Sequence, residues 1–410
     1  MSTECQPPPA RCILVAGPAG SGKSTLATAL AVRRGLPLLD LDTLTNPLLD
    51  GLPASVLGEH WLAPAHGTAI RDARYAALTA VAAEVTATAG AAVLVAPFTA
   101  ELAGGAAWDR LRAALGPADP VVVWIHGDAE LLARRRAHRQ AERDRHRPDT
   151  AAPPQPAVPH ITVDAELTTE QQLFRVLRAA GERLPVPADA PLFDPAATPD
   201  FDAVLFDLDG TLADSTASVT RCWDRLAREF GAPAGLVQEN HGQPADVLVG
   251  VLVGPDRQAA GRARIRELEI TDAPSIDPIP GAHQFFSSVP EQRRAIVTSG
   301  VRDLATARLG AVGLPVPRTM VTFDDVEHGK PHPEPYLLAA RRLGLDPARC
   351  LVFEDAPAGI ASARAAGCRV VGVLGTSPAA ELAGAELLVD GLDRLILVRQ
   401  GEGLRLLPAN

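Results

Sequence analysis

Two short segments of the sequence combine residue types and spacings that suit phosphate chemistry. The first, GPAGSGKS from Gly17 to Ser24, has the pattern GxxxxGK[ST]. Its glycines let backbone N–H groups point at phosphate oxygens, and its lysine and final hydroxyl could reach the phosphates and the Mg²⁺ ion of a nucleotide. The second, FDLDGTL, places Asp207 and Asp209 two positions apart after an apolar run. One carboxylate can attack phosphorus, and the other can serve as acid and base.

The two lysines of the chain also point to phosphate handling. The sequence has 39 lysines and arginines, of which only Lys23 and Lys330 are lysines. Lys23 lies in the glycine-rich segment, and Lys330 lies in the phrase GKPHPEPY. A compact ammonium suits a single phosphate oxygen in a way that the guanidinium fork does not. The placement of these lysines therefore favours two separate phosphate sites.

Both segments lie in stretches where apolar strand-like runs alternate with helix-like runs, which is the pattern of α/β proteins with parallel sheets. The glycine-rich segment sits between a strand-like run and a helix-forming run, as a phosphate loop requires. The predicted strands of the first half are Ile13–Ala16, Leu38–Leu41, Ala92–Ala96, Val121–Ile125 and Ile161–Val163. Those of the second half are Val204–Phe206, Ala295–Val297, Met320–Thr322, Leu351–Phe353 and Val370–Val373.

The chain is predicted to have two domains, because 410 residues exceed one ordinary domain. Residues 1–10 are rich in proline and are expected to be disordered. A first domain is expected at residues 11–184 and a second at 200–410. Residues 185–199 have five prolines and no helical period, so they are expected to form a linker.

Composition and charge narrow the possible partners. The net charge of −10 disfavours nucleic acid and anionic membranes as partners. The most apolar long stretch, residues 76–100, contains Glu84 and Pro97 and is a poor membrane span. The five cysteines have no CxxC spacing, so neither a disulfide framework nor a zinc site is expected. No secretory signal is visible, and we expect a soluble cytoplasmic protein.

The first half resembles the gluconate-kinase-like family of small P-loop kinases. The resemblance rests on the P-loop, on the element Asp40-Leu41-Asp42-Thr43, on the segment from Arg71 to Tyr75, and on the arginine cluster from Arg134 to Asp144. It implies a P-loop NTPase fold with a parallel sheet, ATP as nucleotide ligand, and Asp42 as a catalytic carboxylate near the acceptor. The residues expected to hold the nucleotide are Gly17, Gly20, Ser21, Gly22, Lys23, Ser24 and Thr25, with Ser24 also a Mg²⁺ ligand.

Two features leave the activity of this half open. Arg135, Arg139 and Arg143 share one helix face, which in this family closes over the transferred phosphoryl group but elsewhere is often a solvated, ion-paired face. An acidic residue at the end of the third strand is missing, because Val93-Leu94-Val95 runs into Ala96-Pro97. The first half could therefore be a kinase, or a nucleotide-binding regulator that transfers no phosphate.

The second half resembles the haloacid dehalogenase superfamily of phosphohydrolases. Its four motifs occur in order: FDLDGTL, IVTS ending at Ser299, Lys330 in GKPHP, and FEDAPAG beginning at Phe353. The resemblance implies a Rossmann-like domain with an α-helical cap at about residues 215–285. It implies that Asp207 is the nucleophile, that Asp209 is the acid and base, and that Thr298 and Lys330 bind the phosphoryl group. The implied Mg²⁺ ligands are Asp207, the backbone carbonyl of Asp209, Asp355 and, in a supporting role, Glu354.

The cap region and the phrase around Lys330 look most like the sugar- and glycerol-phosphatase branch of this superfamily. This likeness implies a small sugar or polyol phosphate as substrate. His241 of the cap could lie at the substrate entrance or be an ordinary surface residue. His328 and His332 flank Lys330 and are expected to support the loop rather than bind metal. A phosphomutase remains an alternative, because it would share all four motifs.

Overall fold

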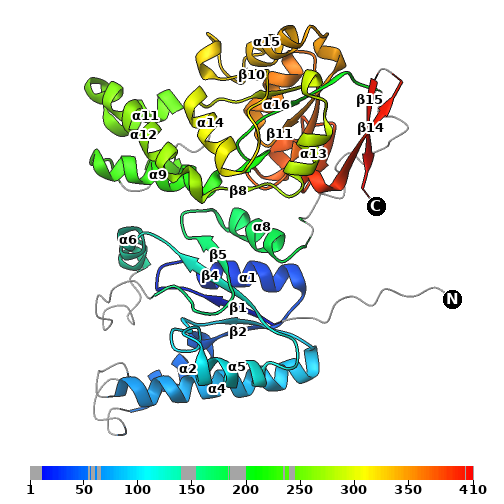
Figure 1. Cartoon of the computed structure of the whole chain (residues 1–410). Helices are drawn as coiled ribbons and strands as arrows, with labels where there is room; N and C mark the ends of the chain where they lie inside the picture. The colour runs from blue at the N-terminus through cyan, green and yellow to red at the C-terminus, as the bar shows by residue number, and fades with distance from the viewer. Residues whose placement is uncertain are drawn as a thin grey trace, which may run out of the picture. The chain divides into compact units, whose positions relative to one another are not determined.

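The computed structural model describes residues 12–53, 56, 61, 66–139, 154–182, 184, 200–233, 236–239, 245–401 and 403–409. The chain divides into two compact units, Met1–Glu182 and Arg183–Asn410 (Figure 1). The expectations for residues 1–10 and for the linker at 185–199 lie outside the described residues.

The first unit has a five-stranded sheet in the order β2-β3-β1-β4-β5, and all of its pairings are parallel. One face packs on α1 and α8, and the other on α4 and α5 (Figure 1). The strands are β1 (Ile13–Ala16), β2 (Leu38–Asp40), β3 (Val93–Val95), β4 (Val121–His126) and β5 (Ile161–Asp164). The helices are α1 (Lys23–Arg34), α2 (Leu41–Asp50), α4 (Gly67–Ala89), α5 (Gly105–Ala114), α6 (Ala129–Arg139) and α8 (Thr169–Ala179).

The second unit has a six-stranded parallel sheet in the order β10-β9-β6-β11-β12-β13. The strands are β6 (Ala203–Phe206), β9 (Arg294–Val297), β10 (Met320–Val321), β11 (Cys350–Glu354), β12 (Arg369–Val373) and β13 (Leu387–Val389). The helices around it are α13 (Ala282–Ser288), α14 (Arg302–Ala311), α15 (Glu334–Leu343) and α16 (Pro357–Ala365). Both sheets confirm the predicted α/β class with parallel strands.

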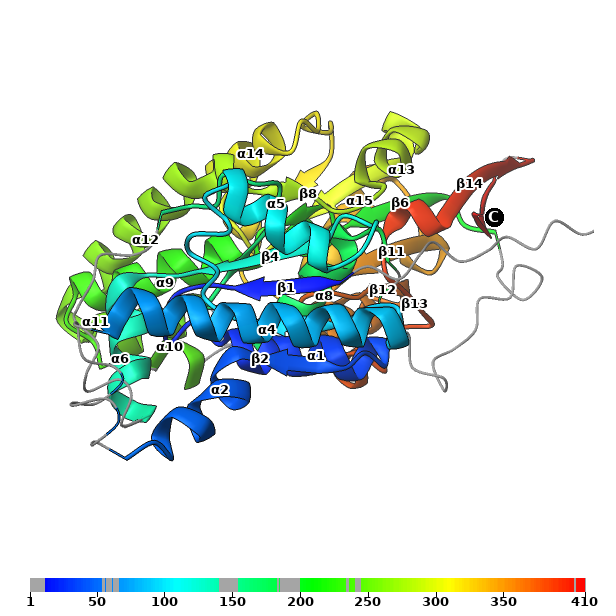
Figure 2. The ribbon, with the colours of Figure 1, turned by 90° about the horizontal axis from the view of Figure 1, so that it is seen from below.

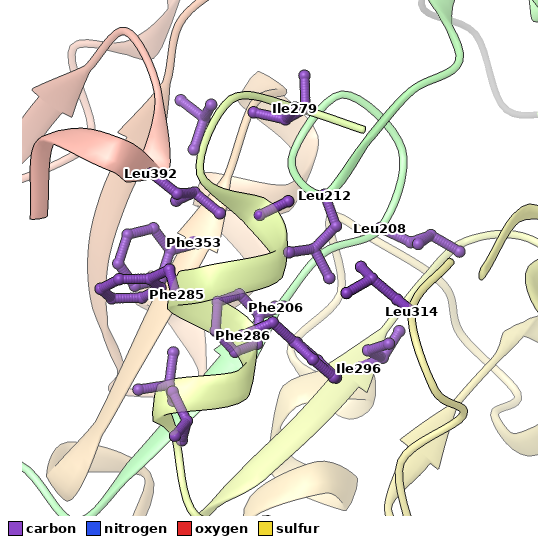
Figure 3. Packing of buried hydrophobic residues seen from close by; sticks show 14 of the residues in the cluster. Phe206, Leu208, Leu212, Ile279, Phe285, Phe286, Ile296, Leu314, Phe353 and Leu392 are labelled. Atoms are coloured by element: carbon purple, nitrogen blue, oxygen red, sulfur yellow. The ribbon is translucent and has the colours of Figure 1, made fainter. Parts of the chain in front are cut away.

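Aromatic rings fix α13 to this second sheet. Phe286 lies 5.4 Å from Phe206, and Phe285 lies 5.1 Å from Phe353, measured between ring centroids (Figure 3). Phe206 and Phe353 are buried residues on the neighbouring strands β6 and β11. Since aromatic pairs at this spacing add to the stability gained from burial alone, they hold firmly the two strands that end at the candidate site.

The cap is a group of helices with an apolar core of its own. Helices α9, α11 and α12 lie together at one side of the second unit (Figure 2). Their buried side chains run from Cys222 to Leu268, whereas Ala273 and the buried residues that follow it belong to the core of the sheet. The predicted end of the cap near residue 285 was therefore too late, because α13 packs on the sheet. The cap helices are α9 (Thr216–Glu229), α10 (Leu236–Glu239), α11 (Ala245–Val253) and α12 (Gln258–Asp272).

Short antiparallel elements complete the second unit. β7 (Ala213–Asp214) pairs with β8 (Asp277–Pro278) where the chain leaves the core for the cap and returns from it. β14 (Leu395–Gln400) and β15 (Gly403–Pro408) form a hairpin. Within the described residues of both units, no helix is both long enough and apolar enough to cross a membrane.

Candidate active sites

The glycine-rich segment forms a tight loop between β1 and α1. Gly17, Gly20 and Gly22 have φ angles of 152°, 87° and 88°. A side chain at Gly17 would place its Cβ 2.5 Å from the carbonyl oxygen of Ile125, and one at Gly20 would come within 2.6 Å of that of Leu132. The loop can therefore follow this path only with glycine at these positions. It ends at the N-terminus of α1, where backbone N–H groups favour an anion.

A carboxylate that the sequence analysis did not single out reaches this loop. The Ser24 hydroxyl donates to Oδ2 of Asp40 at 3.0 Å. Asp40 is the last residue of β2, and its Oδ1 accepts the backbone N–H of Asp42 at 2.9 Å, which caps α2. A hydroxyl beside a carboxylate is an oxygen donor pair of the kind that Mg²⁺ prefers.

Asp42 is paired with an arginine. Arg74 donates to Asp42 at 2.6 Å, to Asn46 at 2.8 Å and to the Thr45 hydroxyl at 2.8 Å. Asp42 lies in the first turn of α2, whereas Asp40 ends the strand before it. The two carboxylates therefore have different surroundings, although only one residue separates them.

Two arginines of helix α6 contact other parts of the first unit, and only one of them, Arg135, belongs to the expected set. Arg136 donates to the carbonyl of Ala19 in the P-loop at 3.3 Å, and Arg135 donates to the carbonyl of Ala165 at 2.8 Å. The side chain of Arg139 and the whole of Arg143 lie outside the described residues. Of the described arginines of this helix, Arg136 is thus the one with a recorded hydrogen bond to the loop.

The four motifs of the second unit meet at the carboxyl ends of neighbouring strands. Asp207 follows β6, Thr298 follows β9 and Asp355 follows β11, and these strands are adjacent in the order β9-β6-β11. Lys330 reaches them from the segment between β10 and α15, and its Nζ donates to Asp207 Oδ1 at 2.6 Å. The carboxyl edge of a parallel sheet is the usual place for a ligand site in such folds.

Lys330 is a buried ammonium with a partner for each of its three N–H groups. Its Nζ donates to Asp207 at 2.6 Å, to Glu354 Oε1 at 2.5 Å and to the carbonyl of Val297 at 2.9 Å. Its side chain is 6% exposed. Burial alone would lower the pKa of Lys330, but the adjacent carboxylates of Asp207 and Glu354 outweigh burial and raise it. Lys330 is therefore charged at neutral pH.

Glu354 accepts four hydrogen bonds in the site. Its Oε1 accepts from Lys330 and from the Tyr336 hydroxyl at 2.8 Å. Its Oε2 accepts the backbone N–H groups of Asp355 at 3.1 Å and Ala356 at 3.3 Å. These four donors surround both oxygens of Glu354, and its carboxylate also lies close enough to Asp207 and Asp355 to share a metal ion with them, so a supporting role at Mg²⁺ stays a prediction. Glu354 contributes negative charge and holds the lysine.

The carboxylates around Asp207 fit a divalent cation. Oxygens of Asp207, Glu354 and Asp355 lie within 4.8 Å of one another, and Asp207 Oδ2 is buried without a hydrogen-bond partner among the described residues. Burial raises the pKa of Asp207 to about 7, although the positive charge of Lys330 acts to lower it. Burial also raises the pKa of Asp355. A Cβ at Gly210 would collide with the Asp355 carboxylate, so glycine lets that group approach. One lysine leaves this oxygen-rich group with excess negative charge, which Mg²⁺ would neutralise.

Two further side chains complete the surroundings of motif I. The Thr298 hydroxyl accepts the backbone N–H of Gly300 at 3.0 Å, and its own proton remains available for donation. Asp209 accepts a hydrogen bond at 2.7 Å from the buried Arg308 of α14. The sequence analysis did not find Arg308, because it lies ten residues after Thr298 and outside any motif.

The two histidines beside Lys330 support the loop through Glu334. The backbone N–H and ring Nδ1 of His328 lie 3.0 and 3.2 Å from Glu334 Oε2. His332 Nδ1 accepts the backbone N–H of Glu334 at 3.3 Å. One ligand atom from each of these three residues also lies close enough to the others to hold a metal ion, so the expectation that they only support the loop stays a prediction. His241 lies outside the described residues.

Each unit matches a known protein family model. Residues 201–367 match the model of the haloacid dehalogenase-like hydrolases, and residues 12–155 match that of an AAA domain. Hexitol phosphatase A of Escherichia coli (strain K12) is 38% identical over 205 residues, which are 48% of this chain and 95% of that protein. Validoxylamine A 7'-phosphate phosphatase of Streptomyces hygroscopicus subsp. limoneus is 36% identical, over 47% of this chain and 94% of that protein. 2-Deoxyglucose-6-phosphate phosphatase 1 of Saccharomyces cerevisiae (strain ATCC 204508 / S288c) is 31% identical, over 49% of this chain and 92% of that protein. Through its C-terminal unit, the chain belongs to the haloacid dehalogenase-like hydrolase family.

Proposed function

We propose that the second unit is a Mg²⁺-dependent phosphatase that hydrolyses the monophosphate of a small sugar or polyol. The observation that carries this proposal is the buried pair of Lys330 and Asp207 at the carboxyl edge of the sheet, next to Asp355. The names of the three related phosphatases, which all denote enzymes for phosphates of sugar-like or polyol compounds, support the substrate class.

The proposed reaction uses two carboxylates in succession. An oxygen of Asp207 attacks phosphorus, the bond from phosphorus to the substrate oxygen breaks, and Asp209 gives its proton to the leaving alkoxide. Asp209 then takes a proton from water, which attacks the aspartyl-phosphate, releases inorganic phosphate and restores Asp207. Lys330, which would exchange one of its present acceptors for the substrate, and the Thr298 hydroxyl would donate to phosphoryl oxygens. Mg²⁺, held by Asp207, Asp355 and the backbone carbonyl of Asp209, would offset the repulsion between nucleophile and phosphate.

A phosphate-release assay with and without Mg²⁺ tests this proposal. A panel of sugar and polyol phosphates should reveal at least one substrate whose hydrolysis stops when a chelator removes the metal. A phosphomutase would instead convert a sugar monophosphate to its isomer and would need a bisphosphate for activity. Isomer formation without net phosphate release would favour that alternative.

Replacement of Asp355 with alanine should raise the Mg²⁺ requirement of the phosphatase strongly. The change removes one carboxylate from a site that has few others to hold the cation, so the Mg²⁺ concentration for half-maximal activity should rise about 10- to 100-fold. A Mg²⁺ titration of phosphate release measures this shift. The matched control is Glu381→Ala, which removes an exposed carboxylate far from the motifs in sequence. An unchanged Mg²⁺ dependence in Asp355→Ala would exclude Asp355 as a ligand.

For the first unit, we propose that the P-loop binds ATP with Mg²⁺. Lys23 would contact the phosphates, Ser24 would ligate the cation, and Asp40 would hold Ser24 or a water of the cation in place. The hydrogen bond from Ser24 to Asp40 supports this assignment. An assay of ATP turnover, with and without candidate acceptors, decides whether the domain also transfers phosphate. A kinase would consume ATP only when an acceptor is present. A regulator would change the phosphatase rate without consuming ATP.

Asp40→Asn and Asp42→Asn should affect different properties of this domain. Asp40→Asn removes the negative charge beside Ser24, so ATP affinity in Mg²⁺ should fall about 10-fold while affinity in EDTA changes little. Asp42→Asn removes a charge that faces Arg74 and should leave ATP affinity unchanged. If Asp42 is the base that deprotonates the acceptor hydroxyl, Asp42→Asn should lose phosphoryl transfer but keep its affinity for ATP. Titration calorimetry with ATP, with and without Mg²⁺, distinguishes the two; equal losses in both variants would contradict the assignment of Asp40.

A further inference from the structure

Arg308 is a buried guanidinium that contacts both motif I and the cap. Its side chain, on α14, is 4% exposed. Nη1 donates to Asp209 Oδ2 at 2.7 Å, and Nη2 donates to Glu269 Oε1 at 3.2 Å. Asp209 belongs to the loop after β6, and Glu269 lies on the cap helix α12. A single side chain thus joins the proposed acid and base to the cap.

The charges around Arg308 make this contact persistent. Burial disfavours a charged guanidinium, but Asp209 and Glu269 outweigh burial and raise the pKa of Arg308. The thiol of Cys222 on α9 faces the same group, and burial raises its pKa to about 12, so it is neutral. Burial also raises the pKa of Glu269. Since a buried cation is costly without partners, Arg308 holds the carboxylates next to it.

The contact with Arg308 gives the two carboxylate oxygens of Asp209 different surroundings. Oδ2 is fixed by Arg308, whereas Oδ1 is buried and has no hydrogen-bond partner among the described residues. A carboxylate held at one oxygen keeps the other in a defined direction. That second oxygen is the one able to exchange a proton with a substrate oxygen or with water.

We propose that Arg308 is the positioning residue that orients Asp209 for proton transfer and couples this orientation to the cap through Glu269. The inference rests on the proposed phosphatase function of the second unit. Arg308 itself touches neither the substrate nor the reacting atoms. It acts by fixing Asp209 Oδ2, so that Oδ1 meets the leaving oxygen when the cap covers the substrate.

A second arginine provides a matched control. Arg266 also joins α12 to α14, because its Nε donates to Asp303 Oδ2 at 2.6 Å. This pair is about half exposed. Asp303 lies near the start of α14, five positions before Arg308, and has no recorded contact with Asp209. If a link between cap and core were all that mattered, loss of Arg266 would resemble loss of Arg308.

The test compares two leaving groups in the full-length protein. An alkyl phosphate, such as glycerol phosphate or the best substrate of the panel, needs a proton on its leaving oxygen, whereas p-nitrophenyl phosphate leaves as a stable anion. Arg308→Met should lower kcat/KM for the alkyl ester about 100-fold, within the range for general acid catalysis, and for the aryl ester less than about 5-fold. The ratio kcat/KM is chosen because it reports the steps up to departure of the alcohol and not the later hydrolysis.

Further variants separate positioning from structure. Arg266→Met should leave kcat/KM unchanged for both the alkyl and the aryl ester. Asp209→Asn should also lower kcat/KM mainly for the alkyl ester. The double variant Asp209→Asn/Arg308→Met should be no slower than Asp209→Asn alone, because both changes remove the same function. Glu269→Gln should raise KM while leaving the ratio between the two esters unchanged, because Arg308 still holds Asp209.

Three outcomes would overturn the inference. Equal losses for both esters in a folded Arg308→Met protein would show a purely structural role. If that variant does not fold, Arg308→Lys, which keeps the charge but cannot span both carboxylates, should show a smaller selective loss, and an unchanged ratio there would contradict positioning. A wild-type protein that hydrolyses neither ester would reject the proposed phosphatase function itself and this inference with it.

Discussion

Asp207→Asn should abolish the phosphatase activity of the full-length protein. The change keeps the size of the side chain but removes the charge that attacks phosphorus, so kcat should fall on the order of 10⁴-fold or more, as when other covalent nucleophiles are lost. Lys330 keeps Glu354 and the carbonyl of Val297 as partners, so the site should stay folded. Phosphate release from the best substrate of the panel measures the loss.

Two controls accompany this variant. Its thermal unfolding should resemble that of the wild type, and its ATP affinity should be unchanged, because the P-loop lies in the other unit. Residual turnover of more than about one per cent, well above the loss expected for a nucleophile, would mean that another group attacks phosphorus.

Lys330→Arg should reduce kcat/KM about 100-fold, although the charge is conserved. The ammonium has three N–H groups and three acceptors within 2.9 Å, in a site where the side chain is 6% exposed. A guanidinium is larger and planar and has five N–H groups, so it must displace a neighbour or leave donors unsatisfied. The loss of one well-placed donor to a phosphoryl oxygen has an effect of this size.

The matched control for Lys330→Arg is Arg341→Lys, which exchanges the same two residue types on the exposed side of α15. It should leave kcat/KM unchanged. Near wild-type kinetics for Lys330→Arg would show that the three contacts of the ammonium do not require lysine, and that the retention of lysine in this arginine-rich chain is accidental.

The sheets could be predicted well from the sequence because most of their strands are buried, although β2 is exposed or half-buried. Each of the ten predicted strands begins and ends within one residue of the corresponding strand among β1–β6 and β9–β12. Short apolar runs are typical of the strands of parallel sheets. The hairpin of β14 and β15 was missed, although Gly401 and Gly403 between two alternating runs are a turn signal. The end of the cap was misplaced because α13 contributes Phe285 and Phe286 to the core of the sheet, and only packing shows which core a helix covers.

The site could be predicted where a motif fixes the residue and not where a long-range contact does. The positions of Asp207, Lys330 and Asp355 followed from motif order and strand ends. The sequence did not show that Asp40 and Asp42 face different partners. Helix α2 begins at Leu41, between them, so Asp40 contacts Ser24 whereas Asp42 contacts Arg74. Arg308 lies 99 positions from Asp209, a separation that no local pattern could bridge.

The formation of a phosphoryl group on Asp207 tests the proposed phosphatase most directly. In Asp209→Asn with p-nitrophenyl phosphate, the leaving group departs without an acid, while hydrolysis of the phosphorylated protein lacks its base, so the adduct should accumulate. Acid quench followed by mass spectrometry should show one added phosphoryl group, on the peptide that contains Asp207, and none in the Asp207→Asn/Asp209→Asn protein. Continued phosphate release with no phosphoryl group on Asp207, or with the group on another residue, would contradict the proposal.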